Sequence, residues 1–430
     1  MTMPPLAGHI NPALAVAAQL QSRGHAIAWA LHGALMLNGS MASERLPSSS
    51  TLLSLPIDSL SLVDSPRDVR GLESVRFFYE DFFLPLAHGS LFPLEKIVRE
   101  FNPDLIVCDQ QMLAGAFVAR KLDIPWLTSV TTTASLIKMS PQHDEWVAEK
   151  FRELEAIYPL PQSVERPDLS PYGVLVFSSK QLLGEDAECF DAPYHFVGPA
   201  YGTRATHDDF PWKKLKADKQ KLLISLGTVS RDRSTRFYEV MMTALADMDI
   251  QVIMVAPETL ALNAPDNFIV LPRVPQLQLL PYMNAVVCHA GHNTVCETLA
   301  HGLPLIVAPI RDDQPVIARQ VIDAGAGLFM RFGKVTAATA RSTVEQLLAN
   351  KNLKQNAERL ARSFEGLGGA ERAAAIIESQ LCGGRSYGKD SYGKHSYGQH
   401  SSENSGYGDR ATESVADPIG NRGNHRVFCG

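Results

Sequence analysis

The sequence predicts an α/β fold of two doubly wound domains with parallel sheets. Short apolar runs alternate with helical periodicity, this series occurs twice, and a segment rich in Gly, Pro and polar residues separates the two series. We expect residues 1–200 to form the first domain, 201–214 the linker and 215–366 the second domain. A helix at 367–382 is expected to cross back to the first domain.

Each predicted element has its own local signal. The first helix is expected to begin at Asn11 and to end before Gly24, since glycine is favoured just past a helix end. Ten apolar runs are expected to be strands; they start at His25, Ser50, Asp104, Ile124, Gly173, Lys221, Ile250, Phe268, Ala285 and Pro304. The aromatic stretch from Ser74 to Leu94 is expected to be helical, either as ordinary core or as the wall of a pocket for a lipophilic ligand.

Residues 383–430 differ in composition from the rest of the chain. SYG repeats with few aliphatic residues cannot offset their ordering entropy, so this tail is expected to be disordered. It is either a dispensable extension or an interaction segment.

Composition excludes several classes of protein. A net charge of -6 argues against a nucleic-acid surface. No apolar run reaches the roughly 20 residues that a transmembrane helix needs, which leaves peripheral membrane contact open. The 6 cysteines are scattered without a CxxC pair, and this pattern favours reduced thiols in the cytoplasm. The oligomeric state is not predicted.

The most informative stretch runs from Ala285 to Gln320. A buried strand ends at Cys288, a small loop follows, and a helix starts near Asn293, where free backbone N–H groups suit a phosphate. The next strand delivers polar residues, among them Asp313, to the same sheet edge, where they can bind hydroxyls. The pattern predicts a phosphorylated, hydroxyl-rich ligand, although a plain helix cap has a similar sequence.

This stretch, from His289 through Gln314, resembles the nucleotide-sugar signature of family 1 glycosyltransferases of the bacterial macrolide and zeaxanthin type, which have the GT-B fold. Other typical segments are GHINP at the amino end, PDLIVCD ending at Asp109, FVGP, SLGT and VPQ, so the resemblance extends to about Leu381. It implies two Rossmann-like domains that face each other across a cleft.

The resemblance implies donor-binding roles for thirteen residues. His289, Asn293 and Thr294 hold the diphosphate, Glu297 the ribose, Gln276 the base, and Asp313 with Gln314 the sugar hydroxyls. The remaining implied donor-site residues are Gly227, Thr228, Arg273, Val274, Gly291 and His292.

Two of these positions depart from the plant form of the signature. His292 stands where Trp is frequent, and Arg273 stands where an aromatic residue stacks on the base. Arginine can also stack, and we favour uracil over thymine. Because no DxD triplet or clustered ligand set occurs, we expect no metal and no cofactor, with the UDP-sugar as a co-substrate.

The resemblance also names a catalytic pair, His9 and Asp109. A neutral histidine suits general-base work, and a carboxylate can fix its tautomer. Only Met1-Thr2-Met3 precede the turn that leads to His9, where the family carries a longer apolar strand. We therefore expect a mostly missing first strand and a loosened loop around His9.

The predicted protein is an inverting, cytoplasmic enzyme that transfers a hexose, preferably glucose, from a UDP-sugar to a hydroxyl of a small lipophilic acceptor. Two alternatives stay open at this point. One is a lipid-linked GlcNAc transferase of the same architecture, whose loop GHINPALA resembles. The other is a non-catalytic scaffold that binds sugar nucleotides.

Overall fold

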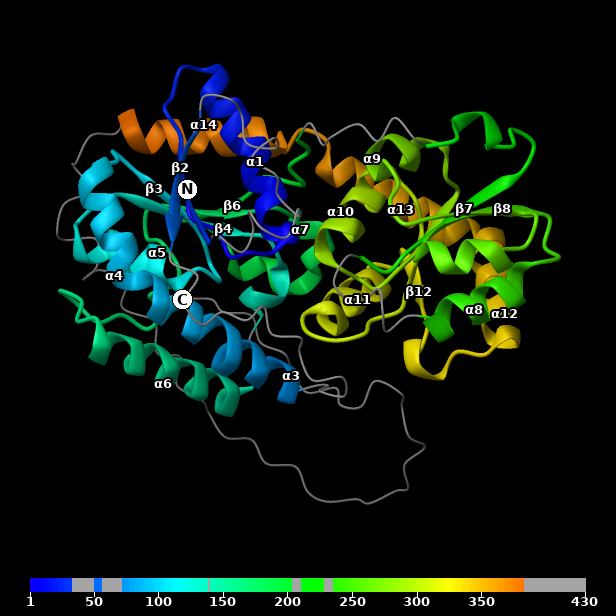
Figure 1. Cartoon of the computed structure of the whole chain (residues 1–430), viewed down its shortest axis with the longest axis horizontal. Coiled ribbons are helices and arrows are strands. Elements are labelled where there is room, and N and C mark those ends of the chain that lie inside the picture. The colour runs from blue at the N-terminus through cyan, green and yellow to red at the C-terminus, as the bar shows by residue number, and fades with distance from the viewer. Residues whose placement is uncertain (33–49, 56–71, 138–139, 203–209, 228–234, 383–430) are drawn as a thin grey trace.

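The computed structural model describes residues 1–32, 50–55, 72–137, 140–202, 210–227 and 235–382. Figure 1 shows two α/β bodies side by side, the first half of the chain on the left and the second on the right. The tail at 383–430, residues 203–209 of the predicted linker and Thr228 lie outside the described residues.

The second body is built on a parallel six-stranded sheet with the order β12-β11-β10-β7-β8-β9. Its strands are β7 (Gln220–Ser225), β8 (Ile250–Val255), β9 (Phe268–Leu271), β10 (Ala285–Cys288), β11 (Leu305–Val307) and β12 (Gly327–Phe329). Its helices are α8 (Thr235–Leu245), α9 (Gln276–Leu279), α10 (His292–Ala300), α11 (Gln314–Asp323), α12 (Ala337–Ala349) and α13 (Lys351–Phe364). Successive β7 residues enter separate cores on the two faces, as expected for a parallel sheet covered on both sides.

The first body has a four-stranded parallel sheet, β3-β4-β5-β6, and a parallel pair, β1-β2. Thr2 bridges Ala30 of β1 and Cys108 of β3, so one residue links the two groups of strands. The strands are β1 (Ala28–His32), β2 (Thr51–Leu55), β3 (Ile106–Asp109), β4 (Trp126–Val130), β5 (Val174–Val176) and β6 (Tyr194–Phe196). The helices are α1 (Ala7–Ser22), α3 (Leu72–Phe77), α4 (Leu84–Phe101), α5 (Leu113–Lys121), α6 (Pro141–Ile157) and α7 (Lys180–Leu183).

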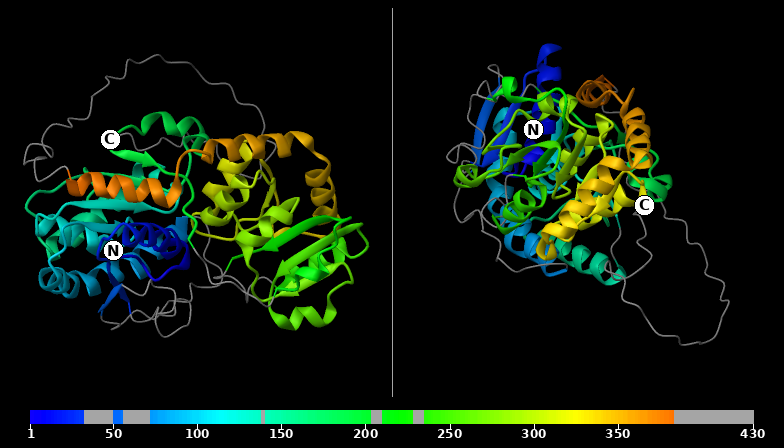
Figure 2. Two further views of the ribbon diagram at one scale, coloured as in Figure 1. Left: turned by 90° about the horizontal axis from the view of Figure 1, so that it is seen from above. Right: turned by 90° about the vertical axis from the view of Figure 1, so that its right-hand side faces the viewer.

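The last described helix, α14 (Gly369–Cys382), lies along α1 in the first body, as Figures 1 and 2 show in orange and dark blue. Glu378 accepts hydrogen bonds from Arg23 (2.7 Å) and His25 (2.9 Å). The α14 contacts therefore tie the end of the second half of the chain to the first body.

The structure departs from the sequence-based elements in four places. Helix α1 begins at Ala7, so His9 lies in its first turn and not in a loop before Asn11. The short strands β6 and β12 were not predicted. The aromatic stretch contains a π-helix, η2 (Phe78–Phe83), between α3 and α4.

Two further observations concern membrane spans and cysteines. None of the described helices combines the length and apolar character that a membrane crossing needs. Cys108, Cys288, Cys296 and Cys382 are free thiols, whereas Cys189 is disulfide-bonded, which departs from the expectation of uniformly reduced cysteines.

Gly115 in α5 sets the approach of that helix to the centre of the sheet. A Cβ there would lie 2.5 Å from Cys108 Cβ and 2.6 Å from Thr2 Cγ2. We predict that Gly115→Ala destabilises the protein by about 1–3 kcal/mol, the usual cost of overpacking. Gly89→Ala is the matched control, because a Cβ at this exposed α4 position meets nothing within 4 Å and alanine favours helix. Urea unfolding of both variants tests this, and equal stability would contradict it.

Candidate active site

His9, Asp109 and Thr131 meet at the carboxyl edge of the first sheet. His9 Nδ1 lies 2.9 Å from Asp109 Oδ2 and 2.7 Å from Thr131 Oγ1, and the Thr131 hydroxyl lies 3.4 Å from the same carboxylate oxygen. Asp109 ends β3, and Thr131 directly follows β4, its parallel neighbour. The topology therefore brings together three segments that are far apart in the sequence.

The burial of Asp109 explains the arrangement. Its side chain is 1% exposed, and its second oxygen accepts a hydrogen bond from the Gln111 backbone N–H at 2.9 Å. A buried carboxylate needs such donors, and it keeps the proton of His9 on Nδ1. The other ring nitrogen, Nε2, makes no hydrogen bond to the described residues, and its lone pair is available to accept a proton.

The charges of Asp109 and Asp313 set the pKa of His9. Burial lowers the pKa of His9, but the charge and hydrogen bond of Asp109, with a smaller effect of Asp313, outweigh it and leave the pKa raised. A raised pKa makes the imidazole a stronger base while Asp109 stabilises the imidazolium that it forms.

On the second body, His289 is the first residue after β10 and packs between two glycines. A Cβ on Gly227 would lie 2.6 Å from the His289 ring, and one on Gly291 would lie 2.5 Å from it. The neighbouring Ala290 has φ 66°, a left-handed conformation that is rare for alanine and typical of functional loops. Burial lowers the pKa of His289 to about 4, so the ring is neutral and can donate one N–H.

Helix α10 starts beside His289 without a side-chain cap, so its first backbone N–H groups, at His292, Asn293 and Thr294, lack helical partners. Such an N-terminus favours an anion. The Asn293 side chain donates to the Gly8 carbonyl at 2.7 Å, across the cleft. Pro12, inside α1, has no N–H to offer that carbonyl, and Asn293 replaces the missing donor.

Two residues that are predicted to bind the nucleoside form a hydrogen bond with each other. Gln276, at the start of α9, donates from Nε2 to Glu297 Oε2 at 2.7 Å, and Glu297 is buried on α10. Arg273 is exposed and Val274 is partly exposed on the loop before α9. Arg273, Val274 and Gln276 follow the carboxyl end of β9, and Glu297 lies on the helix that follows β10.

Asp313 and Gln314 begin α11 and differ in their contacts. Asp313 accepts a hydrogen bond from Thr132 of the first body at 2.6 Å. Burial raises the pKa of Asp313, and this hydrogen bond and the charge of His9 oppose that rise. The Gln314 side-chain oxygen accepts from the Ile310 and Arg311 backbones, so only its amide N–H groups are available to a ligand.

His292 differs from the other predicted donor residues because it is buried between the two bodies. Its Nε2 lies 3.3 Å from the Phe177 carbonyl and 3.4 Å from Cys296 Sγ. Burial lowers its pKa to about 4. The structure thus places His292 in the domain interface and not on the open face of the site.

The sequence analysis did not identify Thr131, which contacts His9, or Thr132, which contacts Asp313. A signal was present, because three successive threonines follow a buried strand at the edge where parallel sheets bind ligands. Among the described residues, no group of three or more His, Cys, Asp and Glu side chains could hold a metal ion.

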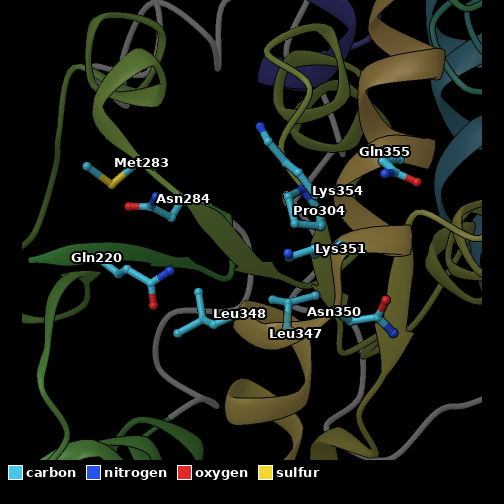
Figure 3. A pocket seen from close by; sticks show the side chains of 10 residues that line it. All are labelled: Gln220, Met283, Asn284, Pro304, Leu347, Leu348, Asn350, Lys351, Lys354 and Gln355. Atoms are coloured by element: carbon cyan, nitrogen blue, oxygen red, sulfur yellow. The ribbon is translucent and has the colours of Figure 1, made fainter.

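A separate cavity of about 350 Å³ lies at the opposite end of the second sheet. Gln220 opens β7, while Asn284 and Pro304 precede β10 and β11, so these lining residues mark the amino ends of the strands (Figure 3). The predicted donor residues follow the carboxyl ends. This cavity therefore does not belong to the site around His9 and His289.

Known proteins with a similar sequence or structure indicate the family and the fold of this chain. Residues 215–365 match the family model described as UDP-glucoronosyl and UDP-glucosyl transferase. The NDP-glycosyltransferase YjiC of Bacillus subtilis is 27% identical over 405 residues, which cover 87% of this chain and 95% of that protein. These matches support a family 1 glycosyltransferase, an enzyme that uses a nucleotide-sugar donor and a small-molecule acceptor.

A further relative and a solved structure are also similar to this chain. The zeaxanthin glucosyltransferase of Pseudescherichia vulneris is 23% identical, with 89% of this chain and 98% of that protein covered. The crystal structure of the glycotransferase of kitacinnamycin superposes with a TM-score of 0.74 at 24% identity, over 89% of this chain and 98% of that one. The glycosyltransferase therefore has the GT-B fold.

The raised pKa of His9 predicts a particular pH dependence. Protonated His9 cannot accept a proton, so kcat/KM should fall as pH decreases through that pKa, which lies above the usual value of about 6.5. Asp109→Asn removes the charge that raises the pKa of His9. The acidic limb of the pH–rate profile should therefore move to lower pH, and the rate should also fall. Glu378→Gln, beside His25, is a histidine–carboxylate control that should leave the limb in place. An unmoved limb in Asp109→Asn would contradict the assignment.

Proposed function

We propose that this glycosyltransferase moves a hexose, preferably glucose, from a UDP-sugar to a hydroxyl of a small lipophilic acceptor, with inversion at the anomeric carbon. One observation carries the proposal: adjacent threonines contact the His9–Asp109 pair of the first body and Asp313 of the second, Thr131 at 2.7 Å from His9 and Thr132 at 2.6 Å from Asp313. A base and a hydroxyl-binding carboxylate on opposite walls of one cleft suit sugar transfer to an alcohol.

The proposed donor site uses the edge around α10. The diphosphate binds the free N–H groups at the start of α10, with a hydrogen bond from neutral His289. Glu297, held by Gln276, accepts hydrogen bonds from the ribose, and Arg273 stacks on the base. The preference for UDP rests on the match to the UDP-glucoronosyl and UDP-glucosyl transferase model.

The proposed reaction is a single displacement. His9 Nε2 removes the acceptor hydroxyl proton as that oxygen attacks the anomeric carbon, and Asp109 stabilises the resulting imidazolium. The bond from the anomeric carbon to the diphosphate breaks on the opposite face, which inverts the configuration. The α10 N-terminus stabilises the charge on the leaving diphosphate, so the reaction needs no metal or cofactor.

The proposed acceptor wall is the aromatic cluster of η2 and α6. Phe82 and Phe83 are buried core residues, whereas Phe78 and Tyr79 are only partly covered. The Tyr79 ring packs edge-on against Trp146 at 5.3 Å. Partly covered aromatic rings favour a flat or lipophilic acceptor, as the name of the zeaxanthin glucosyltransferase indicates for that relative. A cytoplasmic location for such chemistry stays a prediction.

Incubation with UDP-glucose and a panel of phenols, terpenoid alcohols, carotenoids and macrolides, followed by mass spectrometry, tests the function. We expect a product heavier than one acceptor by one hexose residue. His9→Ala should lower kcat/KM by roughly a hundredfold to ten-thousandfold with UDP binding retained. His25→Ala is the control, since its partner Glu378 lies on α14 away from the cleft. Wild-type turnover by His9→Ala, or no donor turnover by the wild type, would refute the proposal.

Thr131 is proposed to position the base. Its hydroxyl contacts only His9 and Asp109 among the described side chains. We predict that Thr131→Val lowers kcat about fivefold to tenfold and leaves the donor KM unchanged, because one hydrogen bond to a charged pair is lost. Thr131→Ser keeps the hydroxyl and should restore kcat. An equal change in KM, or no rescue by serine, would argue against positioning.

A further inference from the structure

Three consecutive threonines contact three different parts of the enzyme. Thr131 contacts His9 of the His9–Asp109 pair. Thr132 donates a hydrogen bond to Asp313 at 2.6 Å, and Thr133 donates one to Gln320 at 2.8 Å. The last two hydrogen bonds cross from the first body to α11 in the second. Only the Thr132 contact involves a residue that the proposed function assigns to the sugar.

The Thr132 hydroxyl gives Asp313 a hydrogen bond even when no nucleotide sugar is bound. It occupies Asp313 Oδ2 as a sugar hydroxyl would, and the side chain of Asp313 is only partly covered. A carboxylate has two oxygens and room for further donors, so a sugar hydroxyl can bind beside Thr132 or in its place. Asp313 therefore has a hydrogen-bond donor whether or not a sugar supplies one.

The backbone of Thr132 is fixed by the first body and not by a ligand. The Ser135 hydroxyl lies 2.8 Å from the Thr132 carbonyl and 2.5 Å from Gln110 Oε1. Gln110 in turn donates to buried Asp168 at 2.8 Å, which Arg166 binds through two nitrogens. This chain of buried polar contacts holds the Thr132 hydroxyl at Asp313.

We propose that Thr132 is a specificity-determining residue which lets the sugar site accept hexoses that lack the hydroxyl facing Asp313. This inference rests on the proposed function, because it takes Asp313 as a sugar ligand. A partly buried carboxylate left without a donor would strongly disfavour a deoxy sugar. With Thr132 present, Asp313 keeps a side-chain donor besides its backbone hydrogen bond, so the loss of a sugar hydroxyl has a smaller effect on the rate.

The test compares donor selectivity in three variants. We measure kcat/KM with one acceptor for UDP-glucose and for its four monodeoxy analogues, and we express selectivity as the ratio of UDP-glucose to each analogue. Thr132→Val should raise this ratio about tenfold or more for one analogue, the one whose missing hydroxyl faces Asp313, and leave the other ratios unchanged. Thr132→Ser should return the wild-type ratio.

Thr133→Val is the matched control. It also removes a buried hydrogen bond between the bodies, but Gln320 is not a proposed sugar residue, so all ratios should stay at their wild-type values. Unchanged ratios in Thr132→Val would overturn the inference, and so would a fall, which would mean that Thr132 itself binds the sugar hydroxyl. Absence of turnover with every donor in the wild type would instead refute the proposed function.

Discussion

The buried carboxylate of Asp109 is the constraint on which the site depends. An ionised group that is 1% exposed must collect hydrogen-bond donors, and here they come from His9 on α1, Thr131 after β4 and the backbone at Gln111. These contacts fix the ring orientation of His9 and raise its pKa. One buried charge thus aligns the ends of three segments and prepares a base at the cleft.

The two bodies meet through side chains that also belong to the site. Asn293 reaches the Gly8 carbonyl, which Pro12 leaves without a helical donor, next to His9. Thr132 reaches Asp313 in the same cleft. Both hydrogen bonds therefore join the two bodies next to residues of the proposed site, one beside His9 and one at Asp313.

The sequence predicted the parts that local patterns determine. Apolar runs located β3 and β10, and the polar residues after them, Asp109 and His289, lie at the expected carboxyl edges. The start of α1 was misplaced, because an interior Pro12 is tolerated only when a distant side chain, Asn293, satisfies Gly8. Thr132 and the burial of His292 depend on contacts between the bodies, which no local pattern encodes. Strands β6 and β12 are mostly only partly buried, unlike the equally short but fully buried β5 and β11, which the sequence did predict.

A crystal structure of the enzyme with an unreactive UDP-fluoroglucose and a lipophilic alcohol tests the central claim most directly. We expect the acceptor oxygen within about 3 Å of His9 Nε2, with the anomeric carbon beyond it and the diphosphate at the start of α10. An acceptor oxygen out of reach of His9 and beside another titratable side chain would contradict it.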